Sequence, residues 1–514
     1  MKNSFIASVA IGLAITLGIV WLIFLFQKEG DSFVSRVTIT QMNVNRVRKP
    51  AVAGAFYPDD KMELTAQLEQ LFAEDEPLDT NGFIRAMVVP HAGYVYSGKT
   101  AAHAYKALSA NVDKENRTAL TVILIGSGHT VNVRGAVIDA HDRWETPLGE
   151  VAIATDIRDM LLHRSALFTV EKDAHREEHS LEVQVPFLQY SLSHFKILPI
   201  LLNSATPDEM QQISHALASI DGDVVIIASS DLSHYPSYDD AKAADEKVIA
   251  SIMSGEIGKL KNTLHQLAQS LIPQAVTFLC AQPAVEVALE VAQLWDAKES
   301  RFLHYSNSGD APAGDKARVV GYTSLAFISQ RKGNELVAEE KETLLRTARA
   351  SVESYVKTAA IPHAQDGSFF LNQARGAFVT IKKNGILRGC IGRFEPDIPL
   401  LPLVSQMAIA AATEDHRFLP VSQEEIGELI YEISVLSPLR KIKDWREIEI
   451  GTHGVRVRKG SREGVFLPQV ATENNWGLEE FMGELCSQKM GMASDCWKDP
   501  HAELYVFTAQ VFGE

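Results

Sequence analysis

The chain has 514 residues, of which 46% are hydrophobic and 22% are charged, so its composition is that of a globular protein with enough apolar residues for two large domains. Its formal net charge is −16 at pH 7, and because an acidic surface repels a phosphate backbone, we expect no nucleic-acid partner. The four cysteines lack CxxC spacing, which argues against a disulfide framework or a structural zinc site and favours reduced thiols.

The first element is an uncharged, mostly apolar run from Phe5 to Phe26. At about 1.5 Å per residue, a helix of this length crosses a hydrocarbon core of about 30 Å. The alternative is a cleaved signal peptide, but the run ends in large apolar residues rather than small ones. We therefore expect a transmembrane helix at 5–26 and a single-pass membrane protein. The side of the membrane that holds the soluble body stays open, because Lys2 is nearly balanced by Lys28 and Arg36.

From Ala51 to about Gln330, short apolar runs alternate with longer helical patterns, which predicts an α/β domain. A helix is predicted over Pro207–Ser219, with Thr206 as its cap, and another over Ala241–Met253. Nearly continuous apolar runs are typical of strands that are covered on both faces. Such runs are Ala86–Pro90, Ala119–Ile125, Lys196–Leu202 and Val224–Ala228.

A polar stretch at 330–335 marks the boundary to a second domain, which we place at 336–514 after a first domain at 48–329. The second domain begins with an amphipathic helix predicted over Glu339–Val356. The remaining predicted elements mix the two types of secondary structure, which indicates an α+β fold. They are strands at Gly376–Lys382, Leu429–Leu436 and Gly464–Leu467, and a helix at Leu401–Thr413.

Polar residues follow three strands of the first domain. His91 follows the first of these strands, His129 the second, and Asp231 and His234 the last. Ligands of open α/β sheets bind beyond the carboxyl ends of the strands, so we expect these side chains to share a pocket. Taken singly, each histidine is better explained as a helix cap or a hydrogen-bonded core residue. Together they indicate a metal or polar-ligand site.

Imidazole and thiolate are good ligands for zinc, copper and iron, and two histidines with one further donor leave an open catalytic position. We take His91 and His129 as metal ligands and Cys280 as the third, although a small buried hydrophobic role is the alternative for a cysteine. His234 is the candidate general acid or base, because an imidazole titrates near neutral pH. Asp231 is expected to orient His234 or to bind the metal.

A second cluster matches the zinc-peptidase pattern H-x-x-E-H at His175, Glu178 and His179. On a helix, His175 and His179 would share one face, as metal ligands must. The alternative is an exposed helix start, where acidic residues are favoured. We prefer a supporting role in the pocket for His179 or Glu182 over a peptidase site.

Motifs along the first domain resemble those of the Memo family, in the family's order from about Arg48 to Ser329. They are Arg48–Pro58, Val89–Tyr94 with Ser97-Gly98, Gly126–His129, Glu178–Glu182, Ser229–His234 and Gly314–Tyr322. The resemblance implies a fold similar to the LigB-type class III extradiol dioxygenases, which are non-haem iron enzymes. It also implies a pocket for a divalent transition metal, iron or copper rather than zinc, at His91, His129 and Cys280. The chain has Cys280-Ala-Gln-Pro283 where many relatives have Cys-Gly.

The second domain resembles the AMMECR family from about Glu339 to Phe512. Its motifs are Leu387–Gly392, Glu414–Phe418 with Pro420, His453–Val455, Val465–Gln469, and Trp476 with Glu479–Phe481. The two families recur with a radical-SAM protein in the AmmeMemoRadiSam system, so the resemblance implies a radical-SAM partner. Cys390 beside Arg388 is either a reactive thiol or, as we favour, a buried strand cysteine. His416 and Arg417 are candidates to line a small-ligand cleft.

Two functions follow from these patterns. The first is a metal-dependent redox or dioxygenase-like activity that works with the radical-SAM partner. The second is a non-enzymatic module that binds a small molecule, a peptide or a protein in an inactive pocket. The sequence leaves the substrate, the metal, the role of the second domain and the oligomeric state open.

Overall fold

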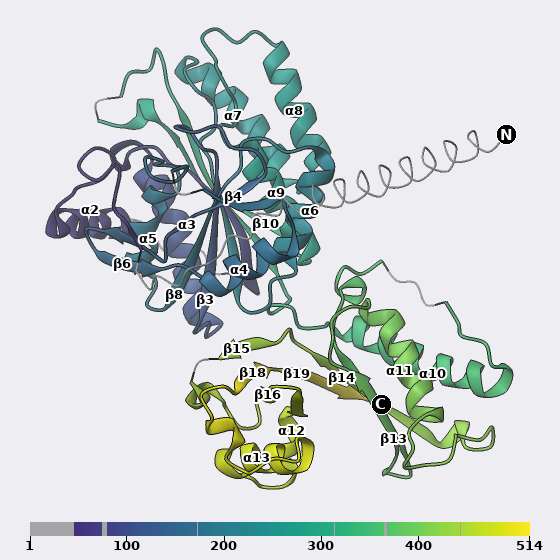
Figure 1. The fold of residues 1–514 in the computed structure, drawn as a ribbon. Coiled ribbons are helices and arrows are strands. Elements are labelled where there is room, and N and C mark those ends of the chain that lie inside the picture. Colours follow the sequence, from purple (N-terminus) through teal and green to yellow (C-terminus); the bar gives the residue numbers. More distant parts are fainter. Residues whose placement is uncertain (1–45, 74–79, 172, 313, 364–366, 443) are drawn as a thin grey trace, which may run out of the picture. The chain divides into compact units, whose positions relative to one another are not determined.

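The computed structural model describes residues 46–73, 80–171, 173–312, 314–363, 367–442 and 444–514 (Figure 1). The predicted transmembrane helix at 5–26 lies outside these ranges. Within them, no helix combines the length and the apolar character that crossing a bilayer requires.

Among the described residues, the first domain has an eight-stranded sheet in the order β10-β11-β2-β9-β3-β8-β4-β7. Its centre is parallel, because β9 pairs in parallel with both β2 and β3, and β3 pairs in parallel with β8. The predicted apolar strands are confirmed by these four elements, β2 (Phe83–Val89), β3 (Leu120–Gly126), β8 (Phe195–Leu201) and β9 (Val224–Ser229). The others are β4 (Ala136–Ile138), β7 (Phe168–Val170), β10 (Glu299–Asn307) and β11 (Gly321–Ser329). The mixed α/β architecture of the first domain is thus confirmed.

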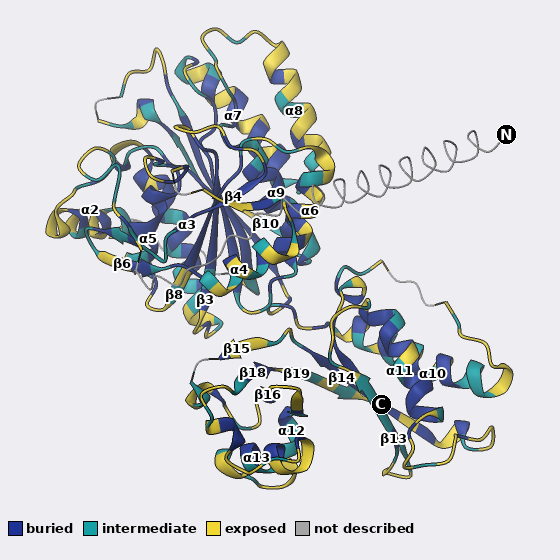
Figure 2. Ribbon diagram, viewed as in Figure 1, coloured by how far each residue is buried: buried dark blue, intermediate teal, exposed yellow. Residues whose placement is uncertain are grey.

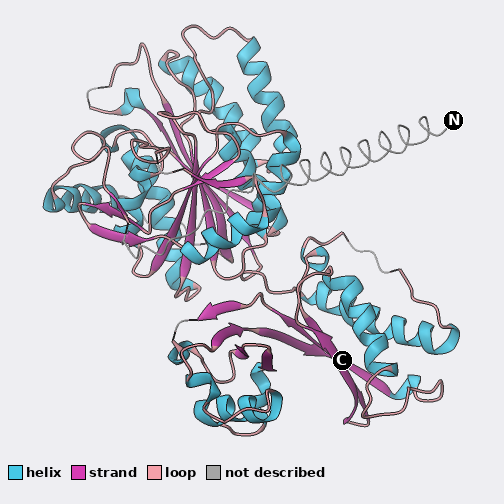
Figure 3. Cartoon of the chain, in the orientation of Figure 1, coloured by secondary structure: helices cyan, strands magenta, loops and turns pink. Residues whose placement is uncertain are grey.

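Helices lie on both sides of this sheet, which explains why its central strands have no polar face (Figures 2 and 3). Helix α3 (Tyr94–Lys114) packs on β2, β10 and β11, whereas α9 (Gln282–Leu294) packs on β2, β9 and β3. The predicted helix α6 (Pro207–Ala218) begins with a capping box between Thr206 and Glu209. The remaining helices of the domain are α2 (Lys61–Ala73), α4 (Thr155–Arg164), α5 (Val185–Ser191), α7 (Tyr238–Met253) and α8 (Ile257–Gln269).

A small three-stranded sheet also belongs to the described part of this domain, in the order β1-β5-β6. It consists of β1 (Val47–Arg48), β5 (Arg143–Thr146) and β6 (Gly149–Ala152). Its first strand brings the beginning of the domain, and with it Arg48, against the segment that follows β7.

The second domain has two antiparallel sheets in its described residues, ordered β13-β12-β14-β19 and β15-β18-β16-β17. The first sheet consists of β12 (Ala377–Lys383), β13 (Ile386–Arg393), β14 (Leu429–Leu436) and β19 (Ala509–Gly513), and α10 (Ala338–Thr358) and α11 (Leu400–Thr413) pack on it. The second consists of β15 (Arg440–Ile442), β16 (Gly454–Lys459), β17 (Arg462–Phe466) and β18 (Glu503–Phe507), next to α12 (Pro468–Glu473) and α13 (Leu478–Glu484). Every predicted element of this domain is present.

The interpretation of all four cysteines as reduced thiols is wrong, because a disulfide joins Cys486 to Cys496. Helix α13 continues into a π-helical turn, η6 (Leu485–Lys489), and the chain then reverses at Gly491, which has a positive φ of 59°. The reversal brings the two Cα atoms to 5.9 Å, within the usual range for a disulfide. Cys280 and Cys390 are free.

Candidate metal centre

The predicted site residues lie at the carboxyl ends of neighbouring parallel strands. His91 follows β2, His129 follows β3, and Asp231 and His234 follow β9, which lies between those two strands. Cys280, in contrast, does not follow a strand and lies in the turn just before α9. Ala281 after it has a φ of −115°, which any residue adopts, so this chain needs no glycine at that position.

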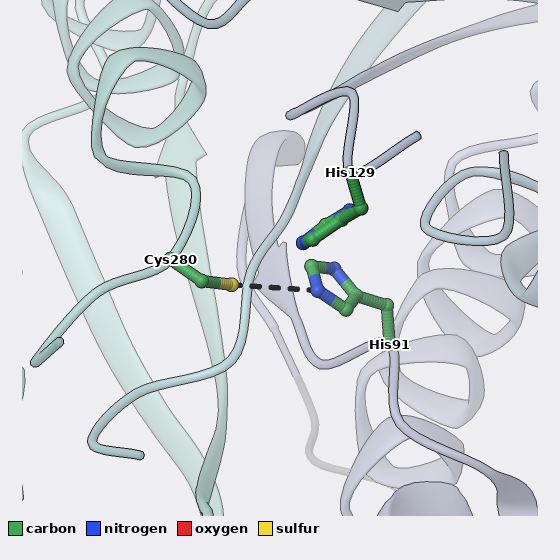
Figure 4. Close-up of side chains that lie close together, drawn as sticks. All are labelled: His91, His129 and Cys280. Carbon is green, nitrogen blue, oxygen red and sulfur yellow. Dashed lines mark hydrogen bonds between the residues drawn. The ribbon is translucent and has the colours of Figure 1, made fainter. Parts of the chain in front are cut away.

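The structure brings His91, His129 and Cys280 together (Figure 4). One ligand atom from each lies within 4.8 Å of those of the other two, and His91 Nε2 is 3.4 Å from Cys280 Sγ. The ligand atoms of a tetrahedral ion lie roughly 3.3–3.8 Å apart, given bond lengths of about 2.0–2.3 Å. Small side-chain rotations would therefore let all three bind one ion. His129 is exposed, so one side of this site is open to solvent.

Burial keeps His91 and Cys280 uncharged. Removal from water, followed by the nearby His129, lowers the pKa of His91, so its imidazole is neutral at pH 7. Burial and the carboxylate of Asp231 raise the pKa of the Cys280 thiol to about 12. A cation would reverse the preference of the thiol, because metals bind thiolates and displace their protons.

A second group of donors, His129, Glu178 and His179, also lies within 4.8 Å, but the hydrogen bonds of Glu178 exclude it as a free ligand. Its carboxylate accepts from the backbone N–H groups of His129, Thr130, His179 and Ser180. It also accepts from His129 Nδ1 at 3.0 Å. A carboxylate has about four lone-pair positions, so these are already used. Glu178 therefore orients His129 and leaves its Nε2 free.

The environment of His129 differs from that of His91. Burial lowers its pKa, but the hydrogen bond to Glu178 and the charge of that carboxylate outweigh burial, so the pKa of His129 is raised. In return, the pKa of Glu178 lies far below its usual range. Burial alone would raise this pKa, but the hydrogen bond from His129 and those from the backbone N–H groups lower it by more. The two groups thus stabilise each other in their hydrogen-bonded geometry.

His234 is held as a base. Its Nδ1 lies 3.0 Å from the carbonyl oxygen of Leu232, which can only accept, so Nδ1 carries the proton and Nε2 has the lone pair. Burial lowers the pKa of His234.

The carboxylate of Asp231 accepts a hydrogen bond from the backbone N–H of His91 at 2.8 Å, and burial raises the pKa of Asp231 to about 7. In the described part of the chain no hydrogen bond links Asp231 to His234, so Asp231 organises the His91 turn instead.

The helical H-x-x-E-H interpretation is wrong, because residues 173–177 form turns and not a helix. His175 is fully buried, with its Nε2 2.9 Å from the carbonyl oxygen of Val137. Arg48 imposes this path, since its guanidinium donates to the carbonyl oxygens of His175 at 2.7 Å and Glu178 at 2.8 Å.

The supporting residues have separate positions. The His179 ring lies 4.6 Å from that of His129 and 5.4 Å from that of His91, so it borders the site. Glu182 forms a buried ion pair with Arg48 at 2.7 Å and accepts from Tyr57 Oη at 2.7 Å. Sequence reasoning missed Arg48 as a functional residue, although it opens the first motif. It fixes the segment that carries Glu178 and His179.

In the second domain, the arginines pair with carboxylates rather than with the thiol of Cys390. Arg388 binds Glu425 at 2.9 Å, and Arg417 binds Asp415 at 2.7 Å. Asp415 also accepts from the backbone N–H of Cys390 at 2.9 Å, a role that the sequence reasoning missed. Cys390 lies within β13 and accepts from Thr380 Oγ1 at 3.2 Å. His416 is exposed and Arg417 lies beside the strand, so this edge carries a polar cluster.

Comparisons with known proteins agree with both resemblances. The family described as Memo-like protein matches residues 48–326, and the family described as AMMECR1 matches residues 345–512. A MEMO1 family protein of Aquifex aeolicus is 36% identical over 288 residues, which are 55% of this chain and 100% of that protein. The MEMO1 family protein MTH_45 of Methanothermobacter thermautotrophicus is 31% identical over 290 residues, 54% of this chain and 100% of that protein.

A solved structure is similar to part of the chain as well. The crystal structure of the uncharacterized protein PH0010 from Pyrococcus horikoshii is 39% identical, covers 34% of this chain and 90% of its own, and gives a TM-score of 0.32. The family matches cover both large domains. The chain therefore belongs to the Memo-like protein family and carries an AMMECR1 domain in the same polypeptide.

Proposed function

We propose that the Memo-like domain is a metal-dependent, dioxygenase-like oxidoreductase that holds a divalent transition metal between His91, His129 and Cys280. The observation that carries this proposal is the convergence of two imidazoles and a thiol at one open strand edge. The histidine and cysteine donors suit zinc, copper and iron alike, and iron or copper is preferred because of the resemblance to the LigB-type extradiol dioxygenases, which use non-haem iron. Such an ion supplies Lewis-acid and one-electron chemistry at its open position.

The protein's own groups have distinct tasks in this proposal. The Nε2 atoms of His91 and His129 and the sulfur of Cys280 hold the ion. His234, neutral and with a free Nε2, accepts a proton from a substrate group and returns it. The exposed side of His129 admits the substrate, whereas the buried side excludes water.

The test is the metal content of the full chain purified in detergent, compared between the wild type and the double variant His91→Ala with His129→Ala. The matched control is His163→Ala with His265→Ala, two exposed histidines of the same domain. We expect the site variant to lose the bound metal and the control to keep it. Equal metal content in all three proteins would refute the proposal.

A second candidate function is non-enzymatic binding, and a groove beside Cys280 favours it. The groove has a volume of about 530 Å³ and runs along residues 264–282. Its lining includes the aliphatic side chains of Leu264, Leu271 and Val276, of which Leu271 is 86% exposed. Gln274, Thr277 and Gln282 line the same groove, so a small molecule or peptide segment with both apolar and polar groups would fit it. Binding of such a ligand with unchanged affinity by the double histidine variant would support this function.

We also propose that the chain works with a radical-SAM protein and is anchored in a membrane by residues 5–26. The presence of Memo-like and AMMECR1 domains in one polypeptide supports the partnership. The disulfide between Cys486 and Cys496 supports a soluble body on the oxidising side of that membrane, since disulfides persist in oxidising compartments. Co-purification of a radical-SAM protein with the tagged chain tests the partnership.

A further inference from the structure

The ability of His91 to bind a metal depends on which ring nitrogen carries its proton. A neutral imidazole has one N–H donor and one lone pair, and only the lone pair can bind an ion. Nε2 of His91 faces Cys280 Sγ at 3.4 Å (Figure 4). Nδ1 of the same ring lies 3.1 Å from Ser229 Oγ. A metal between His91 and Cys280 therefore requires the proton on Nδ1.

The hydrogen bonds of Ser229 decide where that proton lies. The Ser229 hydroxyl is 2.6 Å from the carbonyl oxygen of Ser180, and because a carbonyl can only accept, the single hydroxyl proton is used there. The side-chain amide of Gln184 donates to the same Ser229 Oγ at 2.8 Å. Ser229 has no proton left for His91. The hydrogen bond between them can form only if His91 Nδ1 donates.

The orientation of Gln184 is fixed in turn. Its Nε2 donates to the carbonyl oxygen of Pro90 at 2.9 Å as well as to Ser229, so both amide protons are used. Its Oε1 accepts from Tyr105 Oη at 2.6 Å. A flipped amide would place two oxygens against each other at Pro90, which excludes that orientation. Tyr105, Gln184 and Ser229 are all fully buried, so water does not compete for these bonds.

We propose that Tyr105, Gln184 and Ser229 form a positioning relay that holds His91 with its proton on Nδ1 and its Nε2 lone pair directed at the metal position. The relay rests on the proposed metal site, but none of its three side chains is a predicted ligand. It combines α3, the turn before α5 and β9, three elements that meet only in the folded domain. It is the counterpart of Glu178 at His129, so both imidazoles present Nε2.

The first experiment reads the tautomer without metal. The metal-free full chain, labelled with nitrogen-15 in its histidine rings, is compared by NMR with the Ser229→Ala variant, and the His91 signal is assigned from its absence in His91→Ala. We expect the wild type to show a protonated Nδ1. In Ser229→Ala, Nδ1 has no acceptor, so the proton moves to Nε2, where Cys280 Sγ can accept it. A protonated Nδ1 in both proteins would overturn the relay.

The second experiment measures cobalt(II) affinity by optical titration. We expect Ser229→Ala to bind cobalt about 10–100-fold more weakly, the usual effect of removing a group that orients a histidine ligand. The control is Ser214→Ala, a fully buried serine on α6 whose hydroxyl donates to the carbonyl oxygen of Met210, and it should bind like the wild type.

A third variant keeps the test decisive if Ser229→Ala does not fold. Tyr105→Phe removes one hydroxyl and keeps the ring, which stacks on Phe187. It removes the hydrogen bond to Gln184 Oε1 and leaves the amide held only at Pro90 and Ser229, so we expect a smaller loss of cobalt affinity than in Ser229→Ala and a proton that is less completely on Nδ1. Wild-type affinity and an unmixed tautomer in this variant would contradict the relay. Absence of cobalt binding by the wild type, with the tautomer as expected, would instead refute only the proposed metal function.

Discussion

Glu178 and Asp231 are both buried beside the candidate metal centre, yet their pKa values move in opposite directions. Burial disfavours both charges, but Glu178 receives a hydrogen bond from His129 and several from the backbone, which lower its pKa. Asp231 receives only backbone hydrogen bonds from His91 and Ala92, and burial raises its pKa to about 7. The hydrogen bonds to Glu178 thus outweigh the effect of burial on its pKa, whereas the two backbone hydrogen bonds to Asp231 do not.

This difference makes Glu178→Gln a specific test of how His129 is oriented. Glutamine keeps the size of the side chain but loses the charge, and it brings an N–H group against backbone N–H donors. We expect metal affinity to fall about 10–100-fold because the His129 ring loses its fixed tautomer. Metal titration checks this, with Glu177→Gln as the control, since Glu177 is the exposed neighbour. Equal affinities in both variants would mean that Glu178 does not act through His129.

At the scale of elements, Gly389 shows how closely α11 packs on the second domain's sheet. A Cβ atom at this position would lie 2.0 Å from the carbonyl oxygen of Ala411. Because that oxygen belongs to helix backbone, the helix would have to move away from β13. Gly389 of the Leu387–Gly392 motif is therefore required by packing.

We expect Gly389→Ala to lower the free energy of unfolding by about 1–3 kcal/mol, the usual cost of overpacking a core. Denaturant unfolding of the full chain measures this change. The control is Gly427→Ala, where an added Cβ would meet no atom within 4 Å and φ is not positive. A loss for Gly389→Ala no greater than that for the control would show that α11 shifts at little cost.

The sequence predicted those elements whose identity depends on local pattern. The apolar runs of β3 and β9 and the proline and cap of α6 define their elements without reference to the rest of the chain. The segment at His175 could not be predicted in this way. Its path depends on Arg48, which is 127 residues away and donates to the His175 carbonyl.

The same distinction holds for the site. The order of strands and their polar ends indicated that His91 and His129 would meet, because carboxyl ends of parallel strands share an edge. The relay through Gln184 and Tyr105 was not predictable, since neither residue follows a strand or matches a metal-ligand pattern. Their hydrogen bonds form only when α3 and the turn before α5 pack against β9 in the folded domain.

At the scale of the whole molecule, the proposed side of the membrane for the two large domains depends on the disulfide and on the apolar run at 5–26. A disulfide that closes a short loop stabilises the folded state by about 2–4 kcal/mol. Both of its cysteines are buried, Cys486 within η6 and Cys496 ten residues later, so reductants have little access to the bond. A chain that matures in an oxidising compartment would therefore keep this bond.

We predict that the chain isolated without reductant has two thiols that react after denaturation, and four after reduction. Mass spectrometry after alkylation counts them, and Cys486→Ser with Cys496→Ser is the control, with two reactive thiols in both conditions. In the proposed orientation the body lies on the oxidising side, so a membrane-impermeant protease should digest it when added to cells whose outer layers are permeabilised. Four reactive thiols without reductant, together with a body protected from the protease, would place it on the reducing side instead.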